Sequence, residues 1–213
     1  MYKAIFKSDE RVDSQALLDE FVSWPHDPLR PLYSGNDDWT GVTVLERPHL
    51  DRLKELPALA ALVDRVGRAY VTGVRYFNLA PHSTLHRHRD MYGNLLFGVS
   101  RLHVPIKTNP GAILEVQRIP YHLGLGEVWC LDTSGLHALR NTSDENRIHI
   151  VIDVQRDPRT ERYFPRWTAA TVLHMARFIA IISWKIARDL IRRPGSIAGR
   201  IRGIRGQLKK EAG

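Results

Sequence analysis

The feature of this chain that most constrains its fold is a run of short apolar segments between Ala69 and Val154. Seven segments rich in Val, Ile, Leu and Tyr follow one another there, separated by Pro, Gly and Asn. Such segments with turn residues between them predict β-strands that pair into a sandwich or jelly roll. The expected strands lie near residues 69–78, 84–88, 95–106, 112–118, 127–132, 136–140 and 147–154. The predicted fold class is therefore mainly β with flanking helices.

Two helices are expected before this β-region. Asp13–Trp24 carries apolar residues at helical spacing, and either Asp13 or Ser14 can cap its start. Residues 25–47 contain prolines and turn residues, so they predict a loop with one short strand near Thr43–Leu45. A second helix is expected over Pro48–Val66, kinked by an internal proline and ended by Gly67.

Charge is distributed unevenly along the chain. Residues 1–155 carry 17 Lys and Arg against 19 Asp and Glu, whereas residues 156–213 carry 14 against 4. Within the basic part, Trp167–Arg193 has apolar residues on one predicted helical face and Arg or Lys on the opposite face. We therefore expect a β-domain with N-terminal helices over residues 1–157. Residues 158–213 should form a basic amphipathic helical tail with a mobile Gly/Arg-rich end.

The basic tail indicates an anionic partner. An apolar helical face opposed by arginines is typical of helices that lie on an anionic membrane, so residues 167–193 predict such a contact. Arg177 and Lys185 interrupt the apolar run, which argues against a helix that crosses the bilayer. The alternative is that this face packs on the barrel or on a second subunit in a homodimer. Nucleic acid is a weaker expectation because the tail has few aromatic side chains.

Three residues of the β-region could share a metal ion. His88 and Asp90 stand two positions apart, and side chains two apart on a strand project from the same face. His137 follows a later strand and a turn, so a jelly roll could bring it beside the first two. Two imidazoles and one carboxylate are the donor set of non-haem Fe(II) sites with open positions. Each residue taken alone could instead be an ordinary core or surface side chain.

Cationic side chains alternate with apolar ones on two predicted strands. Arg147, His149 and Asp153 share one parity on the last strand. Arg101 and His103 share one side of an earlier strand. A buried arginine needs an anion because an unpaired interior charge is costly, and a carboxylate fits its planar fork. These residues predict a pocket for an anionic co-substrate. The alternatives are an internal salt bridge for Arg147 and a polar outer face for Arg101 and His103.

Taken in order, these pieces resemble the aspartyl/asparaginyl β-hydroxylase family. The matching pieces are Arg75-Tyr76, Pro81, His88-Arg89-Asp90, Arg101-Leu102-His103-Val104-Pro105-Ile106, Gly126-Glu127-Val128-Trp129-Cys130-Leu131-Asp132, His137, Asn141 and Arg147-Ile148-His149. Their order and spacing agree over the central part of the chain, although no single piece is specific. The family consists of dioxygenases that use Fe(II) and 2-oxoglutarate. The resemblance therefore implies a double-stranded β-helix (jelly roll, cupin-like) followed by a basic C-terminal helix.

The resemblance also implies site residues, cofactors and a reaction. The implied iron ligands are His88, Asp90 and His137, and the implied 2-oxoglutarate contacts are Arg147, Arg101 and His103. His86 shares the parity of His88 but does not match the family pattern. The implied cofactor is Fe(II), with 2-oxoglutarate as co-substrate and O2 as oxidant. The reaction implied is hydroxylation of an unactivated C–H bond in an aspartyl or asparaginyl residue, a free amino acid, or a related small molecule or peptide.

Two further interpretations stay open. One is hydroxylation of a membrane lipid acyl chain by an enzyme docked through its basic tail. The other is a non-catalytic cupin-like protein that binds a metal or ligand, although such a barrel needs no co-substrate anchor at Arg147. Cys130 is the single cysteine, so no intrachain disulfide can form, and Met1–Asp9 lacks the apolar stretch of a signal peptide. We therefore expect a cytoplasmic protein, in part peripheral to the membrane.

Overall fold

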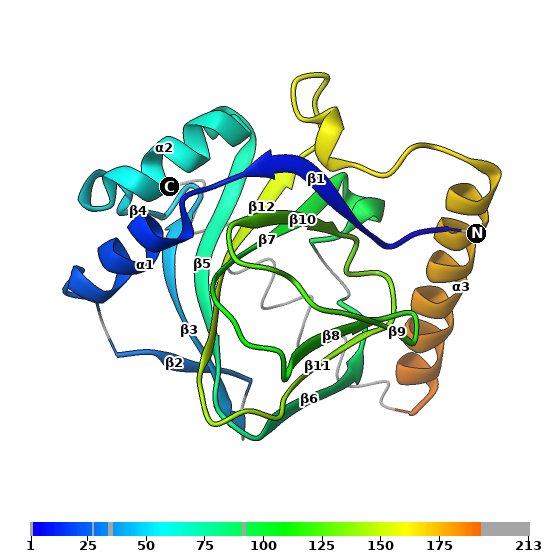
Figure 1. The fold of residues 1–213 in the computed structure, drawn as a ribbon. Helices are drawn as coiled ribbons and strands as arrows, with labels where there is room; N and C mark the ends of the chain where they lie inside the picture. The colour runs from blue at the N-terminus through cyan, green and yellow to red at the C-terminus, as the bar shows by residue number, and fades with distance from the viewer. Residues whose placement is uncertain (1, 27, 34–35, 91–92, 193–213) are drawn as a thin grey trace, which may run out of the picture. The chain divides into compact units, whose positions relative to one another are not determined.

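The strands pair into two antiparallel sheets that face one another (Figure 1). This computed structural model describes residues 2–26, 28–33, 36–90 and 93–192. The larger sheet contains, in spatial order, β1 (Ile5–Arg11), β10 (Glu127–Leu131), β7 (Val99–Lys107), β12 (Arg147–Gln155), β5 (Val71–Leu79), β3 (Asn36–Glu46) and β2 (Arg30–Tyr33), with β4 (Leu50–Asp51) paired to β3. The smaller sheet contains β6 (Ser83–His88), β11 (His137–Asn141), β8 (Ala112–Val116) and β9 (Ile119–Tyr121). Many neighbouring strands are distant in the chain, as in a jelly roll, so the predicted fold class is confirmed.

Two helices cover the outer face of the larger sheet (Figure 1). Helix α1 spans Ser14–Ser23, and the Asp13 side chain caps its start as predicted. Its Phe21 packs on Tyr76 of β5, with ring centroids 4.3 Å apart. Helix α2 spans Pro57–Val66. Short 3-10 helices lie at Leu53–Glu55, Arg68–Tyr70, Leu95–Phe97 and Glu161–Tyr163. Because helices cover this sheet from outside, apolar side chains on both of its faces are buried.

The predicted helix over Pro48–Val66 is wrong in its first half. The chain there forms β4 and a 3-10 turn, and α2 begins at Pro57. Proline fits the first position of a helix because the missing N–H has no partner there in any case. The start of α2 is capped by Glu20 of α1, whose carboxylate accepts hydrogen bonds from the N–H of Ala58 at 2.6 Å and of Leu59 at 3.0 Å. Gly67 ends the helix in the left-handed conformation, as predicted.

The prediction for residues 25–47 is wrong in part: the strand expected near Thr43–Leu45 exists, but it is the end of the long strand β3, and β2 precedes it where a loop was expected. Strand β3 pairs with β5 over most of its length, with Trp39 opposite Leu79. The first residues of β3 are polar, so the sequence does not indicate a strand there, because the preference of a segment for strand depends on the strands it pairs with. Strands β1 and β9 were not predicted either. Strand β1 carries charged side chains, which suit an edge strand.

The described residues divide into two units, one ending at Trp167 and the other beginning at Thr168. Within the second unit, helix α3 spans Ala169–Arg192, close to the predicted bounds. The expected mobile Gly/Arg-rich end lies outside the described residues. The assignment of the domains as 1–157 and 158–213 stays a prediction.

Candidate metal and co-substrate site

The pairing of β6 with β11 joins the two predicted histidine ligands. His137 lies directly opposite His88 in the antiparallel register, and the ring centroids are 4.3 Å apart. Asp90 follows β6 by two residues, with its Oδ1 atom 3.6 Å from His88 Nε2. One possible ligand atom from each of the three residues lies within 4.8 Å of the others. The fold therefore brings together three residues that span 50 positions of the chain.

Backbone carbonyls orient both imidazoles. His88 Nδ1 lies 2.8 Å from the carbonyl oxygen of His86, and His137 Nδ1 lies 2.9 Å from that of Gly135. A carbonyl oxygen can only accept, so each Nδ1 carries the proton and donates it. The Nε2 atom of each ring then holds the lone pair that a metal needs. This arrangement of a ligand and its outer partner is usual for metal-binding histidines.

The carboxylate of Asp90 is fixed by neighbouring loops and by Arg101. Its backbone N–H donates to the carbonyl oxygen of Thr133 at 3.0 Å, and Asn94 Nδ2 donates to its carbonyl oxygen at 3.0 Å. Arg101 Nη1 donates to Asp90 Oδ2 at 2.7 Å. One carboxylate oxygen is thus held by an arginine, while the other faces His88. Such support keeps a ligand oriented before an ion binds.

Arg101 is itself held by a second carboxylate. The register of β7 and β12 sets Arg101 opposite Asp153, and Arg101 Nε donates to Asp153 Oδ1 at 2.7 Å. Arg75 of β5 donates to Asp153 Oδ2 at 2.7 Å. Burial alone would raise the pKa of Asp153, but the two arginines outweigh burial and lower it. Arg101 therefore lies between two of the chain's own acids, and its predicted contact with a co-substrate stays a prediction.

Arg147 lies in the interior without an acidic partner. Its residue exposure is 3%, and within the described chain it forms no ion pair with a carboxylate. Nη2 donates to His149 Nδ1 at 2.7 Å, while Nη1 has no hydrogen-bond partner among the described residues. Burial lowers the pKa of Arg147 to about 9. The guanidinium group is thus charged at neutral pH and is available to an anion.

Two buried histidines surround this arginine. His103 and His149 lie with ring centroids 5.9 Å apart. Both nitrogens of His103 and Nε2 of His149 lack a partner among the described residues. Burial, and then the charge of Arg147, lowers the pKa of both rings well below the ordinary value, so both are neutral at pH 7. Buried polar atoms are nearly always paired in proteins, so this cluster has the composition of a ligand site.

One narrow cavity joins the metal-ligand cluster to Arg147. Its open volume is about 20 Å³, enough for roughly one water molecule. The lining side chains come from both sheets and the loops between them: Trp39, Phe77, Leu85, His88, Asp90, Arg101, His103, Leu114, Leu131, Thr133, His137, Leu139 and Arg147. A ligand larger than water therefore requires movement of side chains in this lining. All six residues predicted for the site line this cavity.

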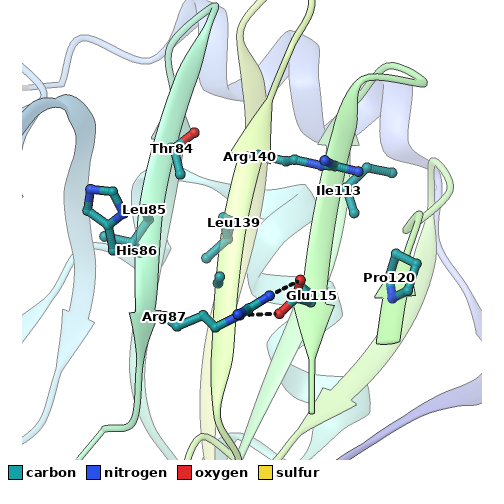
Figure 2. A pocket seen from close by; sticks show the side chains of 10 residues that line it. Thr84, Leu85, His86, Arg87, Ile113, Glu115, Pro120, Leu139 and Arg140 are labelled. Atoms are coloured by element: carbon teal, nitrogen blue, oxygen red, sulfur yellow. Dashed lines mark hydrogen bonds and ion pairs between the residues drawn. The ribbon is translucent and has the colours of Figure 1, made fainter. Parts of the chain in front are cut away.

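A larger hollow of about 500 Å³ lies on the outer face of the smaller sheet (Figure 2). His86 lines it, away from the metal-ligand cluster, and Arg87 pairs there with Glu115 through two hydrogen bonds of 2.5 and 2.9 Å. None of its described side chains is a buried polar group without a partner. We therefore take the smaller interior cavity as the candidate site, because unpaired buried donors and possible metal ligands meet only there within the described chain.

Sequence reasoning missed several contributors to the site. Trp39 and Phe77 line the cavity and pack edge to face, with centroids 5.4 Å apart. Trp39 was hidden in a segment predicted as loop. His149 and Asp153 were placed on the face of Arg147 by their shared parity, but they were not predicted as parts of the site. Their partners could not be read from the sequence because the register of β12 with β7 is a property of the folded sheet.

Comparisons with known proteins identify a family for most of this chain. Residues 11–157 match the family model described as aspartyl/asparaginyl β-hydroxylase. The L-proline cis-4-hydroxylase of Rhizobium meliloti (strain 1021) is 31% identical over 103 residues, which is 48% of this chain and 36% of that protein. The chain thus spans little more than a third of that relative's length.

Solved structures share the fold. The non-haem α-ketoglutarate-dependent carbocyclase SnoK from nogalamycin biosynthesis superposes with a TM-score of 0.55 at 16% identity, over 73% of this chain and 81% of SnoK. The epimerase SnoN from the same biosynthesis superposes with a TM-score of 0.53 at 9% identity, over 71% of this chain and 78% of SnoN. At such identities the likeness extends to the fold alone. The family match covers most of the chain, and by it the chain belongs to the aspartyl/asparaginyl β-hydroxylase family.

Proposed function

We propose that the protein is an Fe(II)- and 2-oxoglutarate-dependent dioxygenase that hydroxylates an unactivated C–H bond of a small molecule. The observation that carries this proposal is the meeting of two features in one cavity. A two-histidine, one-carboxylate cluster lies at one end, and Arg147, buried without an acid, lines the same cavity. A plain metal-binding barrel needs only the first feature. The second calls for an anionic co-substrate.

The donor set fits Fe(II). His88 and His137 would offer Nε2 atoms and Asp90 would offer Oδ1, since their other polar atoms are held by carbonyls or by Arg101. When bound, the iron would supply the open coordination positions and the one-electron and oxygen chemistry that protein side chains lack. Arg101, neutralised by Asp153, would orient the aspartate ligand without leaving a net positive charge beside the metal.

The cluster around Arg147 fits the co-substrate. The guanidinium fork would pair with the distal carboxylate of 2-oxoglutarate, where two parallel hydrogen bonds are favourable. His149 would hold the guanidinium in position by accepting its hydrogen bond. His103 is neutral and lines the cavity between the sheets, so it would donate a hydrogen bond without adding charge. The surrounding leucines would exclude water from the reacting atoms.

Three classes of substrate are candidates, and we rank them by the support for each. A relative named as a proline hydroxylase supports a free amino acid as the first candidate substrate, with proline foremost. Aspartyl and asparaginyl residues, after which the family is named, form the second candidate. An acyl lipid is a further candidate, supported by helix α3, which is long and apolar enough to meet a bilayer.

The test is succinate formation by purified protein supplied with Fe(II), 2-oxoglutarate and O2, with each candidate substrate added in turn. We expect succinate release that depends on the metal and is accelerated by one of the candidate substrates. His137→Ala should abolish this release and iron binding alike. His86→Ala is the matched control, because this exposed histidine lies on the outer hollow, and it should retain both. Equal turnover in the two variants would refute the ligand assignment. Iron binding without 2-oxoglutarate binding would favour the non-catalytic barrel.

A further inference from the structure

Helix α3 exposes many large apolar side chains. Val172, Leu173, Ile179, Ile181, Trp184, Ile186 and Ile191 are each between 37% and 82% exposed. A surface helix of a soluble protein normally buries such side chains in one stripe and exposes polar ones. Isolated exposed apolar residues need no explanation, but a continuous set on one element marks a contact surface.

The exposed apolar residues lie on two sides of α3, and one of these sides is free of Arg and Lys. Val172, Ile179 and Ile186 recur every seven positions, which places them in one row along the helix. Arg177 and Arg188 stand eleven positions apart and form another row, roughly 140–160° around the axis from Val172. Leu173, Ile181, Trp184 and Ile191 lie roughly 100–180° from Val172, on the same side as these arginines. One side of α3 is therefore apolar, and the opposite side mixes cationic and apolar side chains.

The composition of α3 differs from that of a buried core helix. The stretch Ala169–Arg188 is long and apolar enough to cross a membrane, with a mean hydropathy of 1.3. Only 17% of its most apolar 18 residues are buried. A crossing helix would, however, place Arg177 near the middle of the stretch, in the most apolar part of the bilayer. A helix lying in the plane of the surface keeps its cationic side at the headgroups.

We propose that α3 is an in-plane membrane helix that docks the protein on an anionic lipid bilayer. The apolar row would insert below the headgroups, and the cationic side would lie among them. The lipid headgroups should be anionic, because residues 156–213 are strongly basic, with 14 Lys and Arg against 4 Asp and Glu. This proposal depends only on α3 and its flanking charge, so it stands or falls separately from the proposed hydroxylase activity.

The experiment is flotation of the full-length protein with vesicles of phosphatidylcholine alone or mixed with phosphatidylglycerol. Binding is expected to the mixed vesicles, and added salt should weaken it, since it depends partly on surface charge. Ile179→Gln should weaken binding about tenfold or more, because it removes one inserted side chain. Ile181→Gln is the matched control. The same change two positions away, in the cationic row, should have a much smaller effect.

Three outcomes would overturn the proposal. The first is failure of the folded protein to bind anionic vesicles. The second is a dimer that ignores vesicles and dissociates in Ile179→Gln, which would make a second copy the partner of this face. The third is bound protein that resists extraction by alkaline carbonate, which would mean that α3 crosses the bilayer. Equal weakening by Ile179→Gln and Ile181→Gln would contradict the assigned orientation. Thermal unfolding of each variant checks that the β-domain remains folded.

Discussion

Replacing Arg147 with methionine should stabilise the protein and abolish its response to 2-oxoglutarate. Burial lowers the pKa of Arg147 to about 9, against an ordinary value of about 12.5. One pKa unit corresponds to about 1.4 kcal/mol, so holding this charge opposes folding by on the order of 4–5 kcal/mol at neutral pH. Methionine is uncharged and of similar length. It leaves His149 Nδ1 without a donor, at a cost of about 1–3 kcal/mol.

The expected net gain from Arg147→Met is thus about 1–4 kcal/mol of unfolding free energy. In a chain of this size that raises the melting temperature by about 2–4 °C per kcal/mol. The gain should also depend on pH in a defined direction. The folded pKa lies below the unfolded one, so the penalty is complete at neutral pH and disappears as pH rises from about 9 towards 12. The difference between the two proteins should shrink over that interval.

The assay is anaerobic thermal unfolding with Fe(II), with and without 2-oxoglutarate. A ligand at a hundred times its Kd stabilises the wild type by about 2.7 kcal/mol. Loss of one partner of a buried charge pair costs about 2–5 kcal/mol, so Arg147→Met should show almost no ligand-induced shift. Arg140→Met is the control, because Arg140 is exposed on the outer hollow, and it should behave as wild type. A variant that melts lower without ligand, or still responds to 2-oxoglutarate, would refute the reasoning.

Three further predictions concern neighbouring groups. Burial keeps the pKa of His149 well below its ordinary value, so the free energy of unfolding should fall as pH drops below about 6.5. In urea titrations, His149→Gln should make this pH dependence shallower. An unchanged pH dependence would count against a neutral His149. Asp153→Asn should lower the free energy of unfolding by about 3–5 kcal/mol, since it leaves Arg75 and Arg101 poorly compensated. As a control, Asp64→Asn removes an exposed ion pair and should lower the free energy of unfolding far less. Equal losses in the two variants would contradict this prediction. Burial raises the pKa of the Cys130 thiol, so thiol reagents should label the folded protein only as fast as it opens, and rapid stoichiometric labelling would disprove this.

Two of the possible metal ligands could be identified from the sequence because residue spacing and strand parity are local properties, whereas His137 was identified through the family resemblance. His88 and Asp90 stand two apart, and their proximity needs only an extended chain. Arg147 stood out because a charged side chain alternates with isoleucines in a strand that had to be buried. These signals survive in a single sequence, since they do not depend on which strands become neighbours.

The partners of these residues could not be predicted, because they depend on register between distant strands. Arg101 was predicted as a co-substrate contact, but its position opposite Asp153 follows from the pairing of β7 with β12. Trp39 lies on β3, whose polar first residues favour a loop until β5 supplies a pairing partner. Helix α2 was extended too far because the apolar spacing continues through a segment that the proline at position 57 separates from it.

The most direct test of the central claim is the anaerobic visible spectrum of the protein with Fe(II), before and after addition of 2-oxoglutarate. We predict a weak charge-transfer band that needs both components, because the metal cluster and Arg147 line one cavity. The band should be absent in His137→Ala and should require far more 2-oxoglutarate in Arg147→Met. A folded wild-type protein that shows no band, or a band that persists in His137→Ala, would contradict the claim that these residues form one iron and co-substrate site.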